Sequence, residues 1–390
     1  MRLSKRINGI VEAGIDGWEV HYRARALRDA GHDITMLSIG DHDQTTPEPL
    51  IAAMAASARG GRTGYMPMPG IPALRDAIAA RVTERTGAAT SRDNVLVVPG
   101  GQAALFAALT AVLDPGDNAL FIDPYYATYP GTIRAVSAIP VPVPAKPEHG
   151  FQPQLTDLQA AGPAKALLIN TPNNPTGVVY SRATMDMIAA FAAERDLWLL
   201  SDEVYGGQVW KGQHISPRVL PGLKQRTLVL NSLSKSHVMT GWRLGWIIGP
   251  PDAIARMTDL SVTTTYGVPG FIQDAGLAAL TQSDAIEAAL TQTYRRRRGI
   301  ALQALHGANG VSCVPPDGAM YMLLDVRSTG MSGIAFAEAL LDKTGIAVMP
   351  GESFGKAATG HVRVALTVED RRLQIVMKRI AEFASDMVRT

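Results

Sequence analysis

Short apolar segments alternate with helical segments from residue 71 to about residue 285, and this alternation restricts the fold more than any other feature. Segments 166–170 and 227–230 are apolar along almost their whole length, which is typical of strands buried on both faces. Helical segments such as 182–196 separate several of these strands. The pattern predicts an α/β protein with a mostly parallel sheet covered by helices. Ligands of such sheets bind beyond the carboxyl ends of the strands, so the residues that follow each strand are the candidates for chemistry.

The pattern changes after about residue 285. A charged helical segment, 285–305, leads to a Pro- and Gly-rich turn, and shorter strands and helices follow it to the end of the chain. This order predicts a smaller α+β unit that the first 45 residues complete. We therefore expect a large domain over residues 46–285 and a small domain formed by residues 1–45 and 286–390.

Composition excludes several classes of function. The 390 residues carry a net charge of only +2, which argues against nucleic acid or an anionic membrane as a partner. The basic run Arg295–Arg298 lies in a helical segment and is expected to form a solvated or dimer-facing surface. A single cysteine, Cys313, excludes an internal disulfide and a cysteine zinc site, and no metal site is predicted. No apolar run is long enough to span a bilayer and no signal-peptide pattern opens the chain, so we expect a cytoplasmic protein.

A single lysine lies in a hydroxyl-rich turn that follows the strand 227–230. Lys235 is close in sequence to the hydroxyls of Ser232 and Ser234 and to the guanidinium of Arg243, groups that suit a phosphate. An amine that is partly removed from water beside positive charge loses its proton more readily and attacks aldehydes. The aldehyde cofactor that carries a phosphate is pyridoxal 5′-phosphate (PLP). Taken alone, such a lysine is ordinarily a solvated charge at a strand end, and the short motif often matches by accident.

The ends of the other strands carry groups that complement such a cofactor. Gly101 and Gln102 open a helix after strand 94–98, where free N–H groups and the helix dipole attract anions. Tyr126 follows strand 119–122 and offers a ring for stacking. Asn174 lies in the rigid turn 171–177. Each feature alone also fits a simple turn or the edge of a core.

A carboxylate completes this set. Asp202 follows strand 198–201, and a carboxylate there suits the protonated nitrogen of a pyridine ring, a metal ion, a helix cap or an ion pair. Tyr205 is close enough in sequence to reach the same ligand, whereas Glu203 should point elsewhere and be structural. Together the strand ends supply a phosphate cradle, a nucleophilic lysine, a partner for the ring nitrogen and a stacking ring. This coincidence is hard to explain by core packing.

These residues, in this order, resemble the class I/II aminotransferases, which are PLP enzymes of fold type I, and the aspartate aminotransferase-like branch in particular. The resemblance extends from about residue 38 to residue 365. It is carried by Gly64-Tyr65, Gly70, Leu74-Arg75, Gly100-Gly101-Gln102-Ala103, Pro124-Tyr125-Tyr126, Asn173-Asn174-Pro175-Thr176-Gly177, Ser201-Asp202-Glu203-Val204-Tyr205, Ser232-Leu233-Ser234-Lys235, Gly241-Trp242-Arg243-Leu244-Gly245 and Pro350-Gly351-Glu352-Ser353-Phe354-Gly355.

The resemblance implies a seven-stranded, mostly parallel sheet with a smaller α+β domain, and a role for each site residue. Lys235 would form the aldimine with PLP and later move a proton between the substrate and the cofactor. Asp202 would face the ring nitrogen, Asn174 and Tyr205 the ring oxygen, and Tyr126 the ring face. The phosphate would be held by Gly101, Gln102, Ser232, Ser234 and Arg243, joined by Tyr65 of the neighbouring subunit in a homodimer. Arg363 would bind the substrate carboxylate, with Gly40 and Asn174 beside it.

The implied reaction is the exchange of an amino group between an L-amino acid and a 2-oxo acid. Segment 262–267 lacks the arginine with which one branch binds a second carboxylate, which favours a neutral or aromatic donor. His42 stands where relatives usually have proline. The main alternative is a PLP-dependent C–S β-lyase on the same fold. A PLP-sensing transcription regulator would need an added DNA-binding domain, and a catalytically inactive relative would not keep a suitable residue at every cofactor contact.

Overall fold

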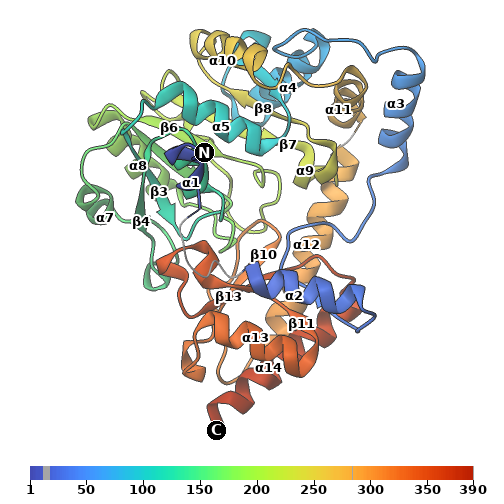
Figure 1. Ribbon diagram of the computed structural model, residues 1–390, viewed down its shortest axis with the longest axis vertical. Helices are drawn as coiled ribbons and strands as arrows, with labels where there is room; N and C mark the ends of the chain where they lie inside the picture. The colour runs from blue at the N-terminus through green and yellow to red at the C-terminus, as the bar shows by residue number, and fades with distance from the viewer. Residues whose placement is uncertain (12–17, 283, 390) are drawn as a thin grey trace.

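The computed structural model describes residues 1–11, 18–282 and 284–389, and its larger part is organised around a seven-stranded sheet. The strand order is β2-β8-β7-β6-β5-β3-β4 (Figure 1). Strand β8 is antiparallel to both of its neighbours, and all other pairs are parallel. The strands are β2 (Val95–Val98), β3 (Asn118–Asp123), β4 (Ile139–Pro144), β5 (Ala166–Asn170), β6 (Trp198–Asp202), β7 (Thr227–Ser232) and β8 (Gly245–Ile248). The predicted α/β fold with a mostly parallel sheet is confirmed.

Helices cover both faces of this sheet, and alternate residues of one strand contact different helices. In β5, Leu167 packs in a cluster with Ile188 of α8, whereas Leu168 packs with Leu105 of α5 on the other face. Because neither face meets water, the strand needs no polar alternation. The helices of this part are α3 (Glu48–Arg59), α4 (Pro72–Thr86), α5 (Gly101–Val112), α6 (Tyr129–Ala135), α7 (Leu155–Ala160), α8 (Arg182–Glu194), α10 (Pro251–Thr263) and α11 (Gly270–Gln282).

Strand β4 was not predicted from the sequence. It reads Ile-Pro-Val-Pro-Val-Pro, and proline has no N–H to donate to a neighbouring strand. The strand lies at the edge of the sheet and pairs only with β3. The residues between the prolines donate their N–H groups toward β3, and each proline nitrogen is on the side that has no partner strand. An edge position tolerates prolines that a central strand would not, and it also protects the edge from pairing with another chain.

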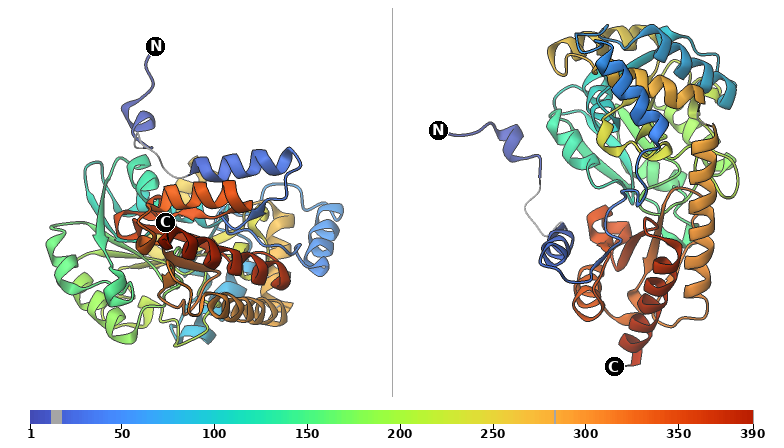
Figure 2. Two further views of the ribbon diagram at one scale, coloured as in Figure 1. Left: turned by 90° about the horizontal axis from the view of Figure 1, so that it is seen from below. Right: turned by 90° about the vertical axis from the view of Figure 1, so that its right-hand side faces the viewer.

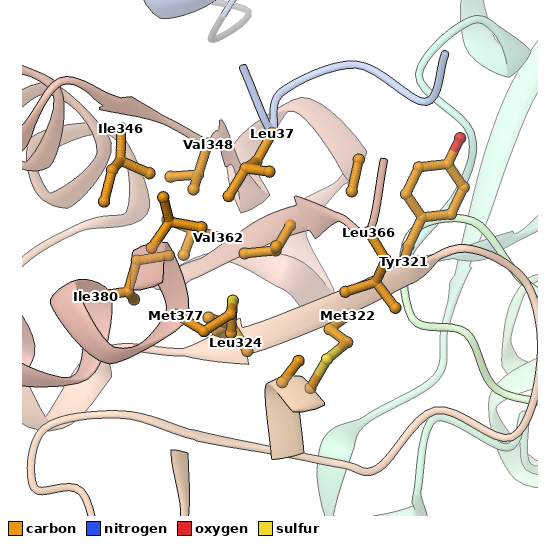
Figure 3. Packing of buried hydrophobic residues seen from close by; sticks show 14 of the residues in the cluster. Leu37, Tyr321, Met322, Leu324, Ile346, Val348, Val362, Leu366, Met377 and Ile380 are labelled. Atoms are coloured by element: carbon orange, nitrogen blue, oxygen red, sulfur yellow. The ribbon is translucent and has the colours of Figure 1, made fainter. Parts of the chain in front are cut away.

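The C-terminal third of the chain and helix α2 (Trp18–Asp29) build the second part. Its four-stranded sheet has the order β12-β13-β10-β9, and β1 (Thr35–Met36) pairs separately with β11 (Ile346–Ala347). Figure 3 shows side chains from these segments, Leu37, Leu324, Val362 and Ile380 among them, packed in one apolar cluster. The other elements are β9 (Ser312–Cys313), β10 (Tyr321–Asp325), β12 (Met349–Pro350), β13 (His361–Ala365), α13 (Gly333–Thr344) and α14 (Asp370–Arg389). We propose domains over residues 46–285 and over 1–45 with 286–390; helix α2 and Leu37 pack with the C-terminal segments, whereas Ile10 contacts Arg134 of α6.

Helix α12 (Asp284–Leu305) runs from one part to the other (Figures 1 and 2). The expectation of a solvated or dimer-facing surface for its arginine run is wrong for Arg297, whose side chain is only 4% exposed. Arg297 donates to both carboxylate oxygens of Asp43 and to Asp370. The guanidinium is buried because acidic partners from the N-terminal loop and from α14 neutralise it.

No helix in the part of the chain that the structure describes is both long enough and apolar enough to cross a membrane. Helix α1 (Lys5–Asn8) is short and carries no buried residue. Helix α9 (Leu233–Ser236), which is as short as α1, contains Lys235.

The packing shown in Figure 3 allows us to predict how much stability is lost when a cavity is made in this cluster. Replacing Leu324, which is fully buried, with alanine should lower the free energy of unfolding by about 3 kcal/mol, because lost burial and a residual void add together. Denaturant unfolding of the purified protein measures this change. Val388→Ala, at a position that is 47% exposed, is the matched control and should change stability by less than about 0.5 kcal/mol. Equal effects of the two variants would contradict the packing described here.

Candidate active site

A cavity of about 330 Å³ opens where the strands of the large sheet end. Asn170, Asp202 and Ser232 are the last residues of β5, β6 and β7, and all three line it. Parallel pairing of the three strands places these ends at the same edge of the sheet. The second part closes the cavity from the opposite side with Tyr321 of β10 and Arg363 of β13.

Lys235 lies directly after β7, in the short helix α9. The hydroxyl of Ser232 caps this helix by accepting from the N–H of Ser234 at 3.4 Å, which fixes the turn that presents the lysine. The Nζ of Lys235 donates to the carbonyl oxygen of Gly40 at 2.5 Å. Gly40 has no room for a side chain, because a Cβ there would lie 1.8 Å from the hydroxyl of Tyr321. The backbone of Gly40 therefore forms part of the cavity wall beside the amine.

An anion-binding surface lies next to Lys235 at the N-terminus of α5. Gly100 precedes the helix with a φ of 85°, a conformation that favours glycine, and a Cβ there would lie 2.4 Å from Nη2 of Arg243. The guanidinium of Arg243 thus lies against the start of α5. Gly101, Ser232 and Ser234 line the same region. Free N–H groups, a helix dipole, hydroxyls and a guanidinium together form a site suited to a phosphate.

The side chain of Gln102, at the second position of α5, is held by two threonines. Its amide donates to Thr132 at 2.8 Å and its carbonyl oxygen accepts from Thr128 at 3.0 Å. These contacts anchor Gln102 at the cavity, where it is one of the lining residues.

Asp202 places a carboxylate in the cavity. It accepts a hydrogen bond from the hydroxyl of Tyr129 at 2.7 Å and one from the N–H of Val204 at 3.3 Å. Burial raises the pKa of Asp202 to about 6, against the lowering effect of these two hydrogen bonds. Removing this carboxylate from water costs free energy, and a cationic N–H partner would offset that cost. A protonated ring nitrogen is such a partner.

Tyr205, Asn174 and Tyr126 surround the cavity between Asp202 and Arg363. The hydroxyl of Tyr205 lies 3.0 Å from that of Tyr321, and Asn174 is fixed by its N–H, which donates to Oδ1 of Asn170 at 2.8 Å. The ring of Tyr126 meets the ring of Tyr129 edge to face at 5.8 Å between centroids. Each polar group is therefore oriented by a neighbour.

Arg363 is buried and has no acidic partner among the described residues. Its guanidinium donates to Oδ1 of Asn174 at 3.0 Å and to the carbonyl oxygen of Ser38 at 2.6 Å, while Nε makes no hydrogen bond within the described part of the chain. The rings of Tyr321 and Phe354 lie 4.6 and 4.5 Å from its central carbon. Burial lowers the pKa of Arg363 from its usual value. A buried cation held in this way is well placed to receive a carboxylate.

The structure brings twelve of the thirteen residues that the sequence singled out to this cavity. The exception is Tyr65, which is 84% exposed and packs against Tyr266 at 4.9 Å between ring centroids. Its contact with the site of a neighbouring subunit stays a prediction. Glu203 points away, as expected, and is buried against His214 and Ser216. The twelve are Gly40, Gly101, Gln102, Tyr126, Asn174, Asp202, Tyr205, Ser232, Ser234, Lys235, Arg243 and Arg363.

Sequence reasoning missed several residues of the site, Asp41 among them, and three of these orient the residues that it found. Tyr129 holds Asp202, Tyr321 contacts Tyr205 and Arg363, and Asn170 donates to the carbonyl oxygen of Asp202 at 3.0 Å. Tyr129 and Asn170 stand at strand ends that were already under consideration, so their position was a usable signal. Tyr321 lies inside a strand of the second part, and no local pattern marks it.

Comparison with known proteins agrees with this geometry. The family described as aminotransferase class I and II matches residues 32–380. The chain is 40% identical, over 100% of its length and 99% of the relative, to a Pseudomonas aeruginosa protein named arginine–pyruvate transaminase AruH. It is 37% identical, over 93% of its length and 94% of the relative, to the aspartate/prephenate aminotransferase of Thermus thermophilus.

Solved structures extend the likeness to three dimensions. The aspartate aminotransferase of Thermus thermophilus with maleate superposes with a TM-score of 0.91 at 35% identity, over 98% of this chain and 100% of that one. An aromatic aminotransferase from Pyrococcus horikoshii gives a TM-score of 0.87 at 31% identity, over 93% and 99% of the two chains. The fold is therefore that of the aspartate aminotransferases, fold type I. The named relatives are all transaminases, and none supports the C–S β-lyase alternative. The chain belongs to the class I and II aminotransferases, and it is an enzyme that exchanges an amino group between an amino acid and a 2-oxo acid.

Proposed function

We propose that this aminotransferase depends on PLP and that Lys235 carries the cofactor. One observation supports the proposal above all others. The amine of Lys235 lies in a cavity that also holds a partly buried carboxylate, a helix N-terminus suited to an anion and a buried guanidinium without an acidic partner among the described residues. A phosphate, a ring nitrogen and a substrate carboxylate are the three groups that this set complements.

The residues of the cavity fit the cofactor. Arg243, Ser232, Ser234, Gln102 and the N–H groups at the start of α5 would hold the phosphate. Asp202 would keep a proton on the ring nitrogen. The positive charge there would in turn offset the free energy that the carboxylate loses on removal from water. When bound, PLP supplies an electron-withdrawing ring that makes the Cα proton of the substrate acidic. The ring face would meet Tyr126, and Asn174 and Tyr205 would hydrogen-bond the ring oxygen.

Lys235 would serve a second purpose once substrate has displaced it. Its free amine would accept the proton from the substrate Cα and return it to the cofactor, as a general base and then a general acid. The hydrogen bond from Nζ to the carbonyl oxygen of Gly40 keeps the amine at the cavity wall in the absence of the cofactor. Arg363 would bind the α-carboxylate, which the amino acid and the 2-oxo acid share, and so position both for the same reaction.

The remaining charges of the cavity bear on the side chain of the amino donor. Among the described residues that line it, the cations are Lys235, Arg243 and Arg363, and each has a role above. Asp41 is the one lining carboxylate besides Asp202, and its Oδ1 accepts from the hydroxyl of Thr240 at 2.8 Å. We infer that the donor has a neutral or positively charged side chain, with Asp41 facing the positive charge. The arginine–pyruvate transaminase among the relatives supports the same choice.

We also propose a homodimer. Tyr65 and Tyr266 form an exposed aromatic pair that lies outside the cavity of its own subunit. The pair suits a contact with a second copy, in which Tyr65 would reach the phosphate of the partner.

The lysine assignment is tested by Lys235→Ala. The variant should lose the visible absorbance of the lysine-linked cofactor and should slow amino transfer by on the order of 10²- to 10⁴-fold, because nucleophile and proton carrier are lost together. Absorbance spectra and single-turnover rates measure both effects. Lys378→Ala, on the exposed face of α14, is the control and should behave as wild type. Turnover by Lys235→Ala at the wild-type rate would refute the assignment.

Replacing Arg363 with glutamine should raise KM about 10- to 100-fold, because a charge-assisted pair with the carboxylate is lost. The rise should be similar for the amino acid and for the 2-oxo acid, since both carry the α-carboxylate. Steady-state kinetics in both directions measure it. A change for only one of the two substrates would contradict a role in carboxylate binding.

Asp41→Asn should lower kcat/KM for arginine about two- to fivefold, the range expected for an exposed ion pair. The value for alanine, which has no side-chain charge, should stay the same, and both are measured with pyruvate as acceptor. Asp252→Asn, an exposed site on α10, is the matched control. An equal loss of kcat/KM for arginine and alanine would show that Asp41 does not recognise the charge of the donor's side chain.

A further inference from the structure

The carbonyl oxygen that accepts from Lys235 belongs to an irregular loop, residues 40–43, that side-chain contacts hold in place. Asp41 accepts from the hydroxyl of Thr240, beyond the lysine turn. Asp43 pairs through both oxygens with Arg297 of α12, at 2.9 and 2.6 Å. Residues 40–43 lie outside the strands and helices, so these side-chain contacts and those of His42 help to fix where the Gly40 carbonyl lies.

His42 contacts the same face of α12 as Asp43 does. Its Nδ1 lies 2.8 Å from the hydroxyl of Tyr294, and Tyr294 is only 1% exposed and stands three residues before Arg297. Burial raises the pKa of Tyr294, so its hydroxyl stays protonated. This hydroxyl donates to Nδ1 in the tautomer of neutral His42 whose ring proton is on Nε2. That atom is buried and makes no hydrogen bond of normal geometry with any described residue.

The titratable and charged groups that face His42 come, among the described residues, from three elements. Lys235 faces it from α9, Asp41 and Asp43 from its own loop, and Tyr294 and Arg297 from α12. Burial, and next the charge of Lys235, lower the pKa of His42 to about 4, while the two aspartates and the backbone of Ser234 act in the opposite direction. The ring is therefore neutral near pH 7, and it fills the space beside the lysine turn without adding a second positive charge there.

We propose that His42 is a positioning residue for Lys235: Tyr294 fixes the imidazole, and the imidazole fixes the loop whose Gly40 carbonyl holds the lysine amine. The inference rests on the proposed function, because it concerns the amine when it is free of the cofactor. In that state the amine must stay near the substrate Cα to move a proton. The contacts from Tyr294 of α12 to His42, and from the Gly40 carbonyl to Nζ, would keep it there.

Two single variants and their combination test whether the Tyr294–His42 hydrogen bond positions Lys235. Tyr294→Phe removes only the donor hydroxyl, and His42→Leu removes only the acceptor ring. Each should lower kcat by about three- to tenfold, the value of one hydrogen bond, with little change in KM, because Arg363 still binds the carboxylate. The double variant should lose no more than the larger single loss, since both remove the same interaction. His42→Asn keeps an acceptor close to the place of Nδ1 and should recover most of the rate.

Tyr180→Phe is the matched control. Tyr180 is also a buried tyrosine, but its hydroxyl has no hydrogen-bond partner among the described residues and it belongs to the core beside α8. Loss of one buried hydroxyl should leave kcat unchanged there. Thermal unfolding of all variants shows whether each is folded.

A second measurement does not depend on turnover. In the protein stripped of PLP, the reductive methylation of Lys235 by formaldehyde and cyanoborohydride is followed by mass spectrometry. His42→Leu and Tyr294→Phe should speed the labelling about three- to tenfold, because Nζ is no longer held on the Gly40 carbonyl. Labelling of Lys378, on α14, should not change.

The inference is overturned if the two single losses add in the double variant, if His42→Asn is no better than His42→Leu, or if the labelling of Lys235 stays at the wild-type rate. These outcomes differ from failure of the proposed function. If the proposed function were wrong, the wild-type protein itself would bind no PLP and would transfer no amino group.

Discussion

The parallel pairing of β5, β6 and β7 is the constraint on which the site depends. It brings Asn170, Asp202 and the Ser232 turn to one edge of the sheet, although they are far apart in sequence. The edge is covered by the second part of the protein, so the polar groups there are removed from water. Each must then be held by a neighbour, as Asp202 is held by Tyr129 and Asn170. The order of the site is thus a consequence of burial at a shared strand edge.

The second part adds a further cation to those that the sheet edge supplies. Arg363 comes from β13, in a sheet that pairs with no strand of the large one, and it reaches Asn174 across the boundary. Helix α12 links the two parts, and its Tyr294 and Arg297 hold the loop 40–43 beside Lys235. The site therefore exists only when both parts are in place, and a change in their relation alters the lysine and the arginine together.

Much of this could be predicted from the sequence, because the relevant signals are local. The apolar strands, the glycines before α5 and the hydroxyls around Lys235 each follow from rules that act over a few residues. Strand β4 was missed because its prolines argue against a strand, and only its edge position makes them acceptable. Tyr321 and the buried state of Arg297 depend on contacts between segments far apart in sequence, with Arg363 and with Asp43. Local patterns carry no record of such contacts.

Two charges of the cavity, one partly and one fully buried, bear on the proposed binding of cofactor and substrate. A carboxyl whose folded pKa is raised, as that of Asp202 is to about 6, binds protons more tightly in the folded state. Its contribution to stability therefore falls as pH rises from about 4 to about 6, and near pH 7 the ionised group costs free energy. Arg363 is likewise buried without an acidic partner among the described residues. A ligand that brings a protonated ring nitrogen and a carboxylate relieves both costs at once. Binding energy is then concentrated where the two reacting molecules must be aligned, and the folded protein is stabilised most when both are present.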